Sequence, residues 1–215
     1  MVKNKKSIFL FVLGITIMIF VFGFVLGYYM DNFRVNNIDF ILKQSELDTE
    51  SLFVENYFSD IFGLDDCEVA SSRLKDYSDK LAYIGNTLTN YENKKMFNKE
   101  DYDLLRRRYF LLELRTYTLI KNLKDRCGNE DFDTILFFYD PEQADSSKQG
   151  YALDKVVLNN NKLYVFSIDR TFDELLINTV KDYYNITISP AIVLNYEFKN
   201  EGFVSSGEIN ELLQK

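Results

Sequence analysis

An uninterrupted apolar run near the N-terminus constrains this chain more than any other feature. Residues 7–30, from Ser7 to Met30, contain no charged side chain. About 20 consecutive apolar residues can cross a bilayer as a helix, whereas the apolar core of a secretory signal spans about 7–15 residues and ends at a small-residue cleavage site. This run is longer, and it ends in Gly27-Tyr28-Tyr29-Met30. We therefore expect an uncleaved anchor and not a signal peptide.

The charges around this run predict its orientation. Lys3, Lys5 and Lys6 precede it, and positively charged flanks stay in the cytoplasm. We expect a single-pass protein of the cell membrane, with a cytoplasmic N-terminus and an extracytoplasmic C-terminal domain. A net charge of -8 argues against a nucleic-acid partner, which requires a basic surface. The short basic run Arg106-Arg107-Arg108 is expected to pair with nearby acids on a solvated face.

The composition also excludes several kinds of site. The chain has no His, which removes His-based triads, His zinc sites and the usual general base of neutral pH. Its two Cys cannot form a four-Cys zinc site. We expect no metal and no cofactor.

Two stretches of the middle region carry seam residues at alternating spacings of three and four. They are Cys67, Ala70, Leu74, Tyr77, Leu81, Ile84, Leu88 and Tyr91, followed by Tyr102, Leu105, Tyr109, Leu112, Thr116, Leu119 and Leu123. This spacing predicts an antiparallel, coiled-coil-like hairpin with its tip near Phe97 and Asn98 as an N-cap. The alternative is two helices that pack on a globular domain and not on each other. Residues 36–63 predict one or two further amphipathic helices.

The two cysteines lie at matching positions of this hairpin. Cys67 opens the first helix, Cys127 closes the second before Gly128, and both are equally far along the chain from Phe97. An antiparallel hairpin places them side by side, and the exported side permits disulfides. We predict a Cys67–Cys127 disulfide. Two unrelated core cysteines, or a redox-active pair, are the alternatives.

After residue 128 the pattern changes to short apolar strands that alternate with helices. We predict strands at 134–139, 163–168, 191–195 and 201–204, and helices at 147–158, 171–184 and 206–213. Thr171 with Glu174 matches a capping box, and Ser206 is predicted to cap the last helix. The order strand, helix, strand, helix, strand, strand, helix gives an α/β domain over residues 129–215. It follows an anchor region, 1–30, and a helical region, 31–128.

This order resembles the thioredoxin fold. The strand at 135–139 that leads into a loop and helix, the step Phe166-Ser167-Ile168-Asp169, the segment 184–195 and Gly202-Phe203 carry the resemblance. The whole chain also looks like small membrane-anchored thioredoxin-like proteins of archaea, in which a helical hairpin precedes this domain. The resemblance implies that Ser189 and Pro190 lie beside the active-site loop, where the family's cis-proline segment pairs with an extended peptide.

The chain departs from the family where its Cys-x-x-Cys motif belongs. By the same resemblance, Gln143 and Ser146 occupy the two cysteine positions, within one residue. Disulfide exchange requires a thiolate, and Ser146 has no His base to activate it. We expect Asp145, Ser146 and Ser147 to form an N-cap cluster instead.

Three functions follow from these features. The leading one is a non-catalytic, membrane-tethered thioredoxin-like module that binds a protein or peptide partner through Ser189 and Pro190. The second is a thiol–disulfide redox protein that uses Cys67 and Cys127. The third is a structural protein that assembles through its coiled-coil seams.

Overall fold

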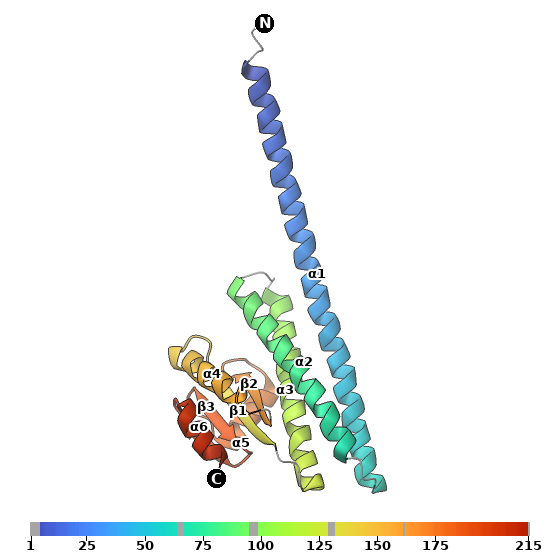
Figure 1. Ribbon diagram of the computed structural model, residues 1–215, viewed down its shortest axis with the longest axis vertical. Helices are drawn as coiled ribbons and strands as arrows, with labels where there is room; N and C mark the ends of the chain where they lie inside the picture. Colours follow the sequence, from blue (N-terminus) through green and yellow to red (C-terminus); the bar gives the residue numbers. More distant parts are fainter. Residues whose placement is uncertain (1–4, 64–66, 95–98, 129–131, 161, 215) are drawn as a thin grey trace. The chain divides into compact units, whose positions relative to one another are not determined.

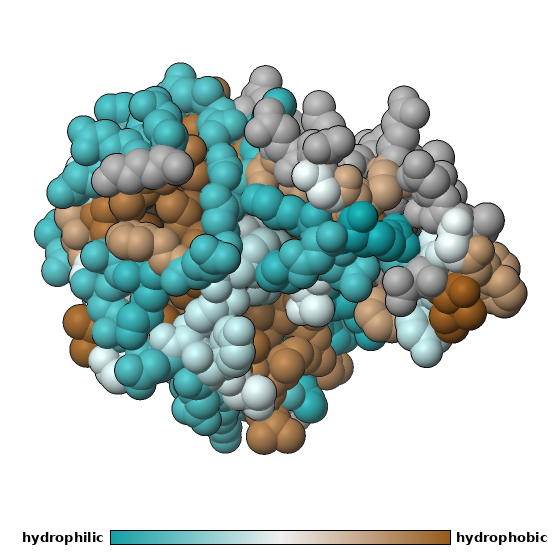
Figure 2. Space-filling model, turned by 90° about the horizontal axis from the view of Figure 1, so that it is seen from below, coloured by the Kyte–Doolittle hydropathy of each residue, from teal (hydrophilic) through white to brown (hydrophobic). Residues whose placement is uncertain are grey.

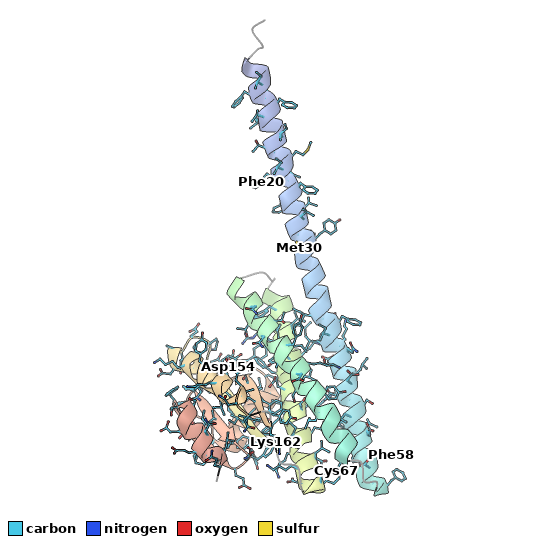
Figure 3. The ribbon with its side chains drawn as sticks, in the orientation of Figure 1. Phe20, Met30, Phe58, Cys67, Asp154 and Lys162 are labelled. Carbon is cyan, nitrogen blue, oxygen red and sulfur yellow. A yellow bond between two sulfur atoms is a disulfide. The ribbon has the colours of Figure 1, made fainter. Side chains whose placement is uncertain are left out.

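The first helix contains the candidate anchor. The computed structural model describes residues 5–63, 67–94, 99–128, 132–160 and 162–214, which fall into two compact units, 1–43 and 44–215. Helix α1 (Lys5–Phe62) runs through the apolar segment without a break. Its stretch Ile8–Met30 is long and apolar enough to cross a membrane, and none of it is buried in the protein. Side chains, including Phe20 and Met30, stand out on all sides of this stretch (Figure 3).

Three helical segments pack together in the second unit. The last part of α1, from residue 44, lies beside α2 (Cys67–Lys94) and α3 (Lys99–Cys127), and α2 and α3 run antiparallel (Figure 1). Ion pairs join Asp48 of α1 to Lys80 of α2, and Glu46 and Glu50 of α1 to Arg108 and Arg115 of α3. The hairpin is therefore built into a three-helix layer.

The two helices of the hairpin meet along the predicted seam. Leu74, Leu81, Ile84 and Leu88 of α2 are buried, as are Leu105, Leu112 and Leu119 of α3. A Cβ added to Gly85 would lie 2.5 Å from the Tyr109 hydroxyl, so any larger residue there requires the Tyr109 ring to shift. The disulfide Cys67–Cys127 closes the base of the hairpin, with Cα atoms 5.9 Å apart.

The C-terminal region is a mixed four-stranded sheet with helices. The elements are β1 (Asp133–Tyr139), α4 (Ala144–Val157), β2 (Leu163–Asp169), α5 (Leu175–Tyr184), β3 (Ala191–Leu194), β4 (Phe198–Glu201) and α6 (Ser206–Leu213). The strands lie in the order β2-β1-β3-β4, with β1 parallel to β2 and antiparallel to β3. The predicted α/β domain is confirmed at this level.

Each face of the sheet is covered by helices. One face forms a core with α4 and α6, which includes Ile135, Phe137, Leu153, Ile192 and Ile209. Because strand residues alternate between faces, Leu136, Phe138 and Phe166 belong to the other face. There α3 packs: the rings of Tyr117 and Phe166 are 5.8 Å apart, and the Tyr117 hydroxyl lies 2.8 Å from that of Tyr184 on α5.

Helix α3 thus has two buried sides. One packs on α2, as the hairpin prediction requires, and the other packs on the sheet, as the alternative requires. The alternative, in which the two helices do not pack on each other, was therefore wrong on that point. The helical region and the α/β domain consequently share a hydrophobic core.

Several predicted helix and strand ends were wrong. Thr171 does not cap α5, because its N–H and hydroxyl both donate to the buried carboxylate of Asp169, and α5 begins only at Leu175. The last helix is capped by Ser205, in a capping box with Glu208, and not by Ser206. The final strand is Phe198–Glu201. Phe97 and Asn98 lie outside the described residues.

Candidate functional site

The loop after β1, where the thioredoxin resemblance places the active site, is closed by its own hydrogen bonds. Ser146 is buried, and its Oγ accepts the N–H of Asp140 at 3.0 Å. The Asp140 carboxylate accepts the N–H of Glu142 and the side-chain amide of Gln143, at 3.0 and 3.1 Å. The predicted N-cap cluster is wrong, because Gln143 is the N-cap of α4 and makes no side-chain cap. Ser146 instead holds the backbone of the loop.

The second half of the site is the segment before β3. The Ser189–Pro190 peptide bond is cis, and Ser189 is 8% exposed. Arg170, which follows β2, donates its Nε to Ser189 Oγ and its Nη1 to the Thr187 carbonyl, at 3.2 and 3.3 Å. The guanidinium therefore holds this segment from one side.

Glu201, at the end of β4, holds the same segment from the other side. Its carboxylate accepts the N–H groups of Thr187 and Ile188 and the Thr187 hydroxyl. The Thr187 N–H that it accepts lowers the pKa of Glu201. Ile188 itself is 52% exposed, and Phe203, two residues beyond Glu201, is 50% exposed. The exposed side chains of Ile188 and Phe203 thus lie near a backbone segment, 187–189, that hydrogen bonds fix in place.

These two halves lie at the same end of the sheet. Phe138 of β1 pairs with Ala191 of β3, so the chain leaves β1 where Pro190 enters β3. The Arg170 N–H also donates to the Tyr139 carbonyl at 2.8 Å, which ties the end of β1 to the residue that holds Ser189. Gln143 in the loop and Ser146 in the first turn of α4 consequently follow β1 at the end of the sheet where Ser189 and Pro190 lead into β3.

The cysteines lie at the other end of β1. Cys127 closes α3 just before the start of β1, and the Lys124 ammonium of the same helix end donates to the Phe132 carbonyl. Seven residues of extended strand separate that end from Tyr139, or about 20 Å. The disulfide is therefore remote from the Ser189–Pro190 segment.

Two ionisable residues of α3, Arg106 and Glu113, lie in its contact with the sheet. Asp169, with a side chain 2% exposed, pairs with Arg106, which is enclosed by the rings of Tyr102, Phe110 and Phe172 at 5.1–5.6 Å. The prediction of a solvated face for this basic run was wrong for Arg106 and Arg108, whose side chains are only 14% and 17% exposed. Arg107 is 56% exposed and pairs with Glu174, whose side chain is 11% exposed.

Glu113 is the second of these buried groups. It accepts the N–H of Ser167, on the edge strand β2, at 3.1 Å, so α3 covers an edge that would otherwise be open to pairing. Burial raises the pKa of Glu113 to about 8, against the smaller lowering effect of its hydrogen bonds from Tyr109 and Ser167. No local sequence pattern marks Arg170, Glu201 or Glu113 as site residues, because each acts through a contact between distant segments.

Solved structures that resemble part of the chain include several thioredoxins. They include chloroplastic thioredoxin z, with 18% identity over 44% of this chain and 86% of that one, at a TM-score of 0.35. Thioredoxin-2 of a malaria parasite, described as a component of its protein secretion machinery, has 19% identity over 39% and 82%, also at 0.35. The germline-specific thioredoxin Deadhead of Drosophila melanogaster has 16% identity over 44% and 90%, at 0.30. No family model and no curated protein matches the chain.

Proposed function

We propose that this protein is a membrane-tethered thioredoxin-like module that binds an extended segment of a partner protein and performs no disulfide exchange. One observation carries the proposal. The loop between β1 and α4 contains no thiol, and the buried Ser146 in the first turn of α4 accepts the Asp140 N–H. The chain's two cysteines are joined to each other at the far end of β1. No thiol therefore stands where a bound peptide would meet it.

The proposed binding site is the surface around Ile188. Arg170 and Glu201 fix the backbone of residues 187–189 from two sides, so little ordering is left to occur when a ligand binds. Ile188 and Phe203 offer exposed apolar contacts to alternate side chains of an extended peptide. The preferred partner segment is then extended and apolar where it meets these two residues.

The tether is the stretch Ile8–Met30, preceded by Lys3, Lys5 and Lys6. By the positive-inside rule it leaves the α/β domain outside the cytoplasm. A module held there would meet partners that are themselves exported or membrane-bound.

A peptide array tests the binding proposal. The full chain in detergent is applied to arrayed extended peptides, and the affinities of the best binders are measured for wild type, Ile188→Asp and Tyr151→Asp. Ile188 is already about half buried, so loss of its contact removes about 1 kcal/mol, and Ile188→Asp should weaken binding roughly fivefold or more. Tyr151, 76% exposed on α4, is the matched control. Equal binding by all three proteins would refute the site.

A redox function for Cys67 and Cys127 is the second candidate, favoured by the half-buried position of both residues. It predicts that reduced protein transfers electrons to a disulfide substrate. Mass spectrometry after thiol alkylation, across a series of redox buffers, separates the candidates. A bond that persists below about −300 mV is structural, whereas one that opens at milder potentials supports the redox candidate.

A further inference from the structure

The outward side of the last turns of α1 is strongly apolar. Leu47, Val54 and Ile61 recur at intervals of seven, and they are 56–73% exposed. Around the last two stand Phe53, Tyr57, Phe58 and Phe62, which are 49–63% exposed. We call these seven residues the outer face. Hydrophobic atoms reach the surface at the right of Figure 2, on the side of the molecule where α1 ends.

The opposite side of the same turns is already used within the chain. Leu52, Asn56 and Ser59 are buried, and Asn56 accepts hydrogen bonds from Arg126 of α3 through its backbone and side-chain oxygens. The outer face is therefore the side of α1 that α2 and α3 leave free.

Three acids of α1 near the outer face form ion pairs within the chain. Glu46 pairs with Arg108, Asp48 with Lys80, and Glu50 with Arg115, at 2.7–3.1 Å. Charge repulsion between two copies is reduced accordingly. What α1 presents outward from residue 53 to residue 62 is mostly apolar surface.

The exposed area suits a protein interface. Each aromatic side chain has roughly 200 Å² of surface, so four of them half exposed offer about 400 Å². Val54, Ile61 and Leu47 add to this. A stable interface needs about 800 Å² per partner, and patches above a few hundred Å² on a monomer mark interaction sites. The outer face thus supplies a large share of what a stable pair needs.

We propose that the outer face is where two copies of this chain pair, in parallel, through α1. A repeat of seven is the repeat of parallel coiled coils, in which the same position of each helix meets its counterpart. Copies inserted in one membrane through Ile8–Met30 point the same way, and confinement to that membrane raises their effective concentration. Val54 and Ile61 then lie on the axis of the pair, with Phe53 of one copy near Phe58 of the other.

Sedimentation equilibrium of the full chain in detergent tests the pairing. Wild type should sediment as a dimer, and the double variant Val54→Glu, Ile61→Glu should dissociate at least tenfold more readily. Both positions are more than half exposed, so the fold should survive, and circular dichroism checks this. Tyr151→Glu, Leu158→Glu is the matched control, because both residues are exposed and lie on or next to α4. It should sediment as wild type does.

Crosslinking gives an independent readout. Cys67 and Cys127 are bonded to each other, so an introduced cysteine is the only free thiol. Val54→Cys should form a disulfide-linked dimer in membranes under mild oxidation, and Tyr151→Cys should not. A monomeric wild-type chain would overturn the proposal and leave the outer face to a different protein. A dimer that the double variant leaves intact would overturn it as well, because the anchor would then carry the association.

Discussion

Arg106 and Arg107 are neighbours on α3, yet their surroundings differ sharply. Arg106 is nearly buried and pairs with a buried Asp169, whereas Arg107 is 56% exposed and pairs with Glu174. Removing one partner of a buried pair leaves an uncompensated charge, at a cost of about 3–5 kcal/mol, whereas a pair with one solvent-exposed partner is screened by water and contributes at most about 1 kcal/mol. Glu174 is itself 11% exposed, so it is the exposure of Arg107 that separates the two pairs. Arg106→Ala should therefore lower the free energy of unfolding by about 3 kcal/mol, and Arg107→Ala by less than about 1. Urea titration measures both, and equal losses would contradict the assignment.

Glu113 should make stability depend on pH in an unusual direction. In the folded protein its pKa is raised to about 8, so between about pH 4.5 and 8 the folded chain keeps a proton that the unfolded chain releases. Its contribution is full below about pH 4.5 and is lost as the pH rises towards 8. Glu113→Gln stays neutral and can still accept the Ser167 N–H.

The variant should therefore match wild type near pH 5 and exceed it at pH 8 by roughly 3–5 kcal/mol at most. Thermal or urea unfolding of both proteins across this range measures the difference. Glu142→Gln, at an exposed position, is the control and should leave the pH profile unchanged. A constant difference between wild type and Glu113→Gln at all pH values would show that Glu113 titrates normally.

At the scale of elements, the disulfide ties the start of α2 to the end of α3 and closes a loop of 60 residues. Closing a loop of this length contributes about 4 kcal/mol in the chain-entropy model, and less where the unfolded state keeps helix. Cys67→Ser, Cys127→Ser should lower the free energy of unfolding by up to that amount in urea. Reductant should destabilise wild type to the same level and leave the double variant unaffected. A double variant as stable as oxidised wild type would contradict a stabilising role.

The elements that could be predicted from sequence are those with strong local patterns. The charge-free run 7–30 predicted the apolar helix, and the two seams predicted that α2 and α3 pack on each other. The second buried side of α3 was predicted only by the alternative, in which the two helices do not pack on each other, although Phe110, Leu114, Tyr117 and Ile120 form another stripe at spacings of three and four. A stripe of apolar residues indicates that one side of a helix is buried, but it does not identify the element against which that side packs.

The candidate site was predictable only in part, for a related reason. The segment around Ser189 and Pro190 was found by its resemblance to a family. Arg170 and Glu201 were not found, because a hydrogen bond between residues 14 or more positions apart produces no recognisable spacing in the sequence. The prediction that Thr171 caps α5 was wrong, because the Thr171 hydroxyl donates to the carboxylate of Asp169 instead.

The proposed exported module requires that the anchor have the orientation that Lys3, Lys5 and Lys6 predict. Val2→Cys and Tyr151→Cys, made separately, each add one free thiol beside the native disulfide. In intact cells a membrane-impermeant maleimide should label Tyr151→Cys, and it should reach Val2→Cys only after permeabilisation. Replacing Lys3, Lys5 and Lys6 with Glu should weaken or reverse this preference, since positive flanks set the orientation. Labelling of Val2→Cys alone in intact cells would place the α/β domain in the cytoplasm, where thiols are kept reduced.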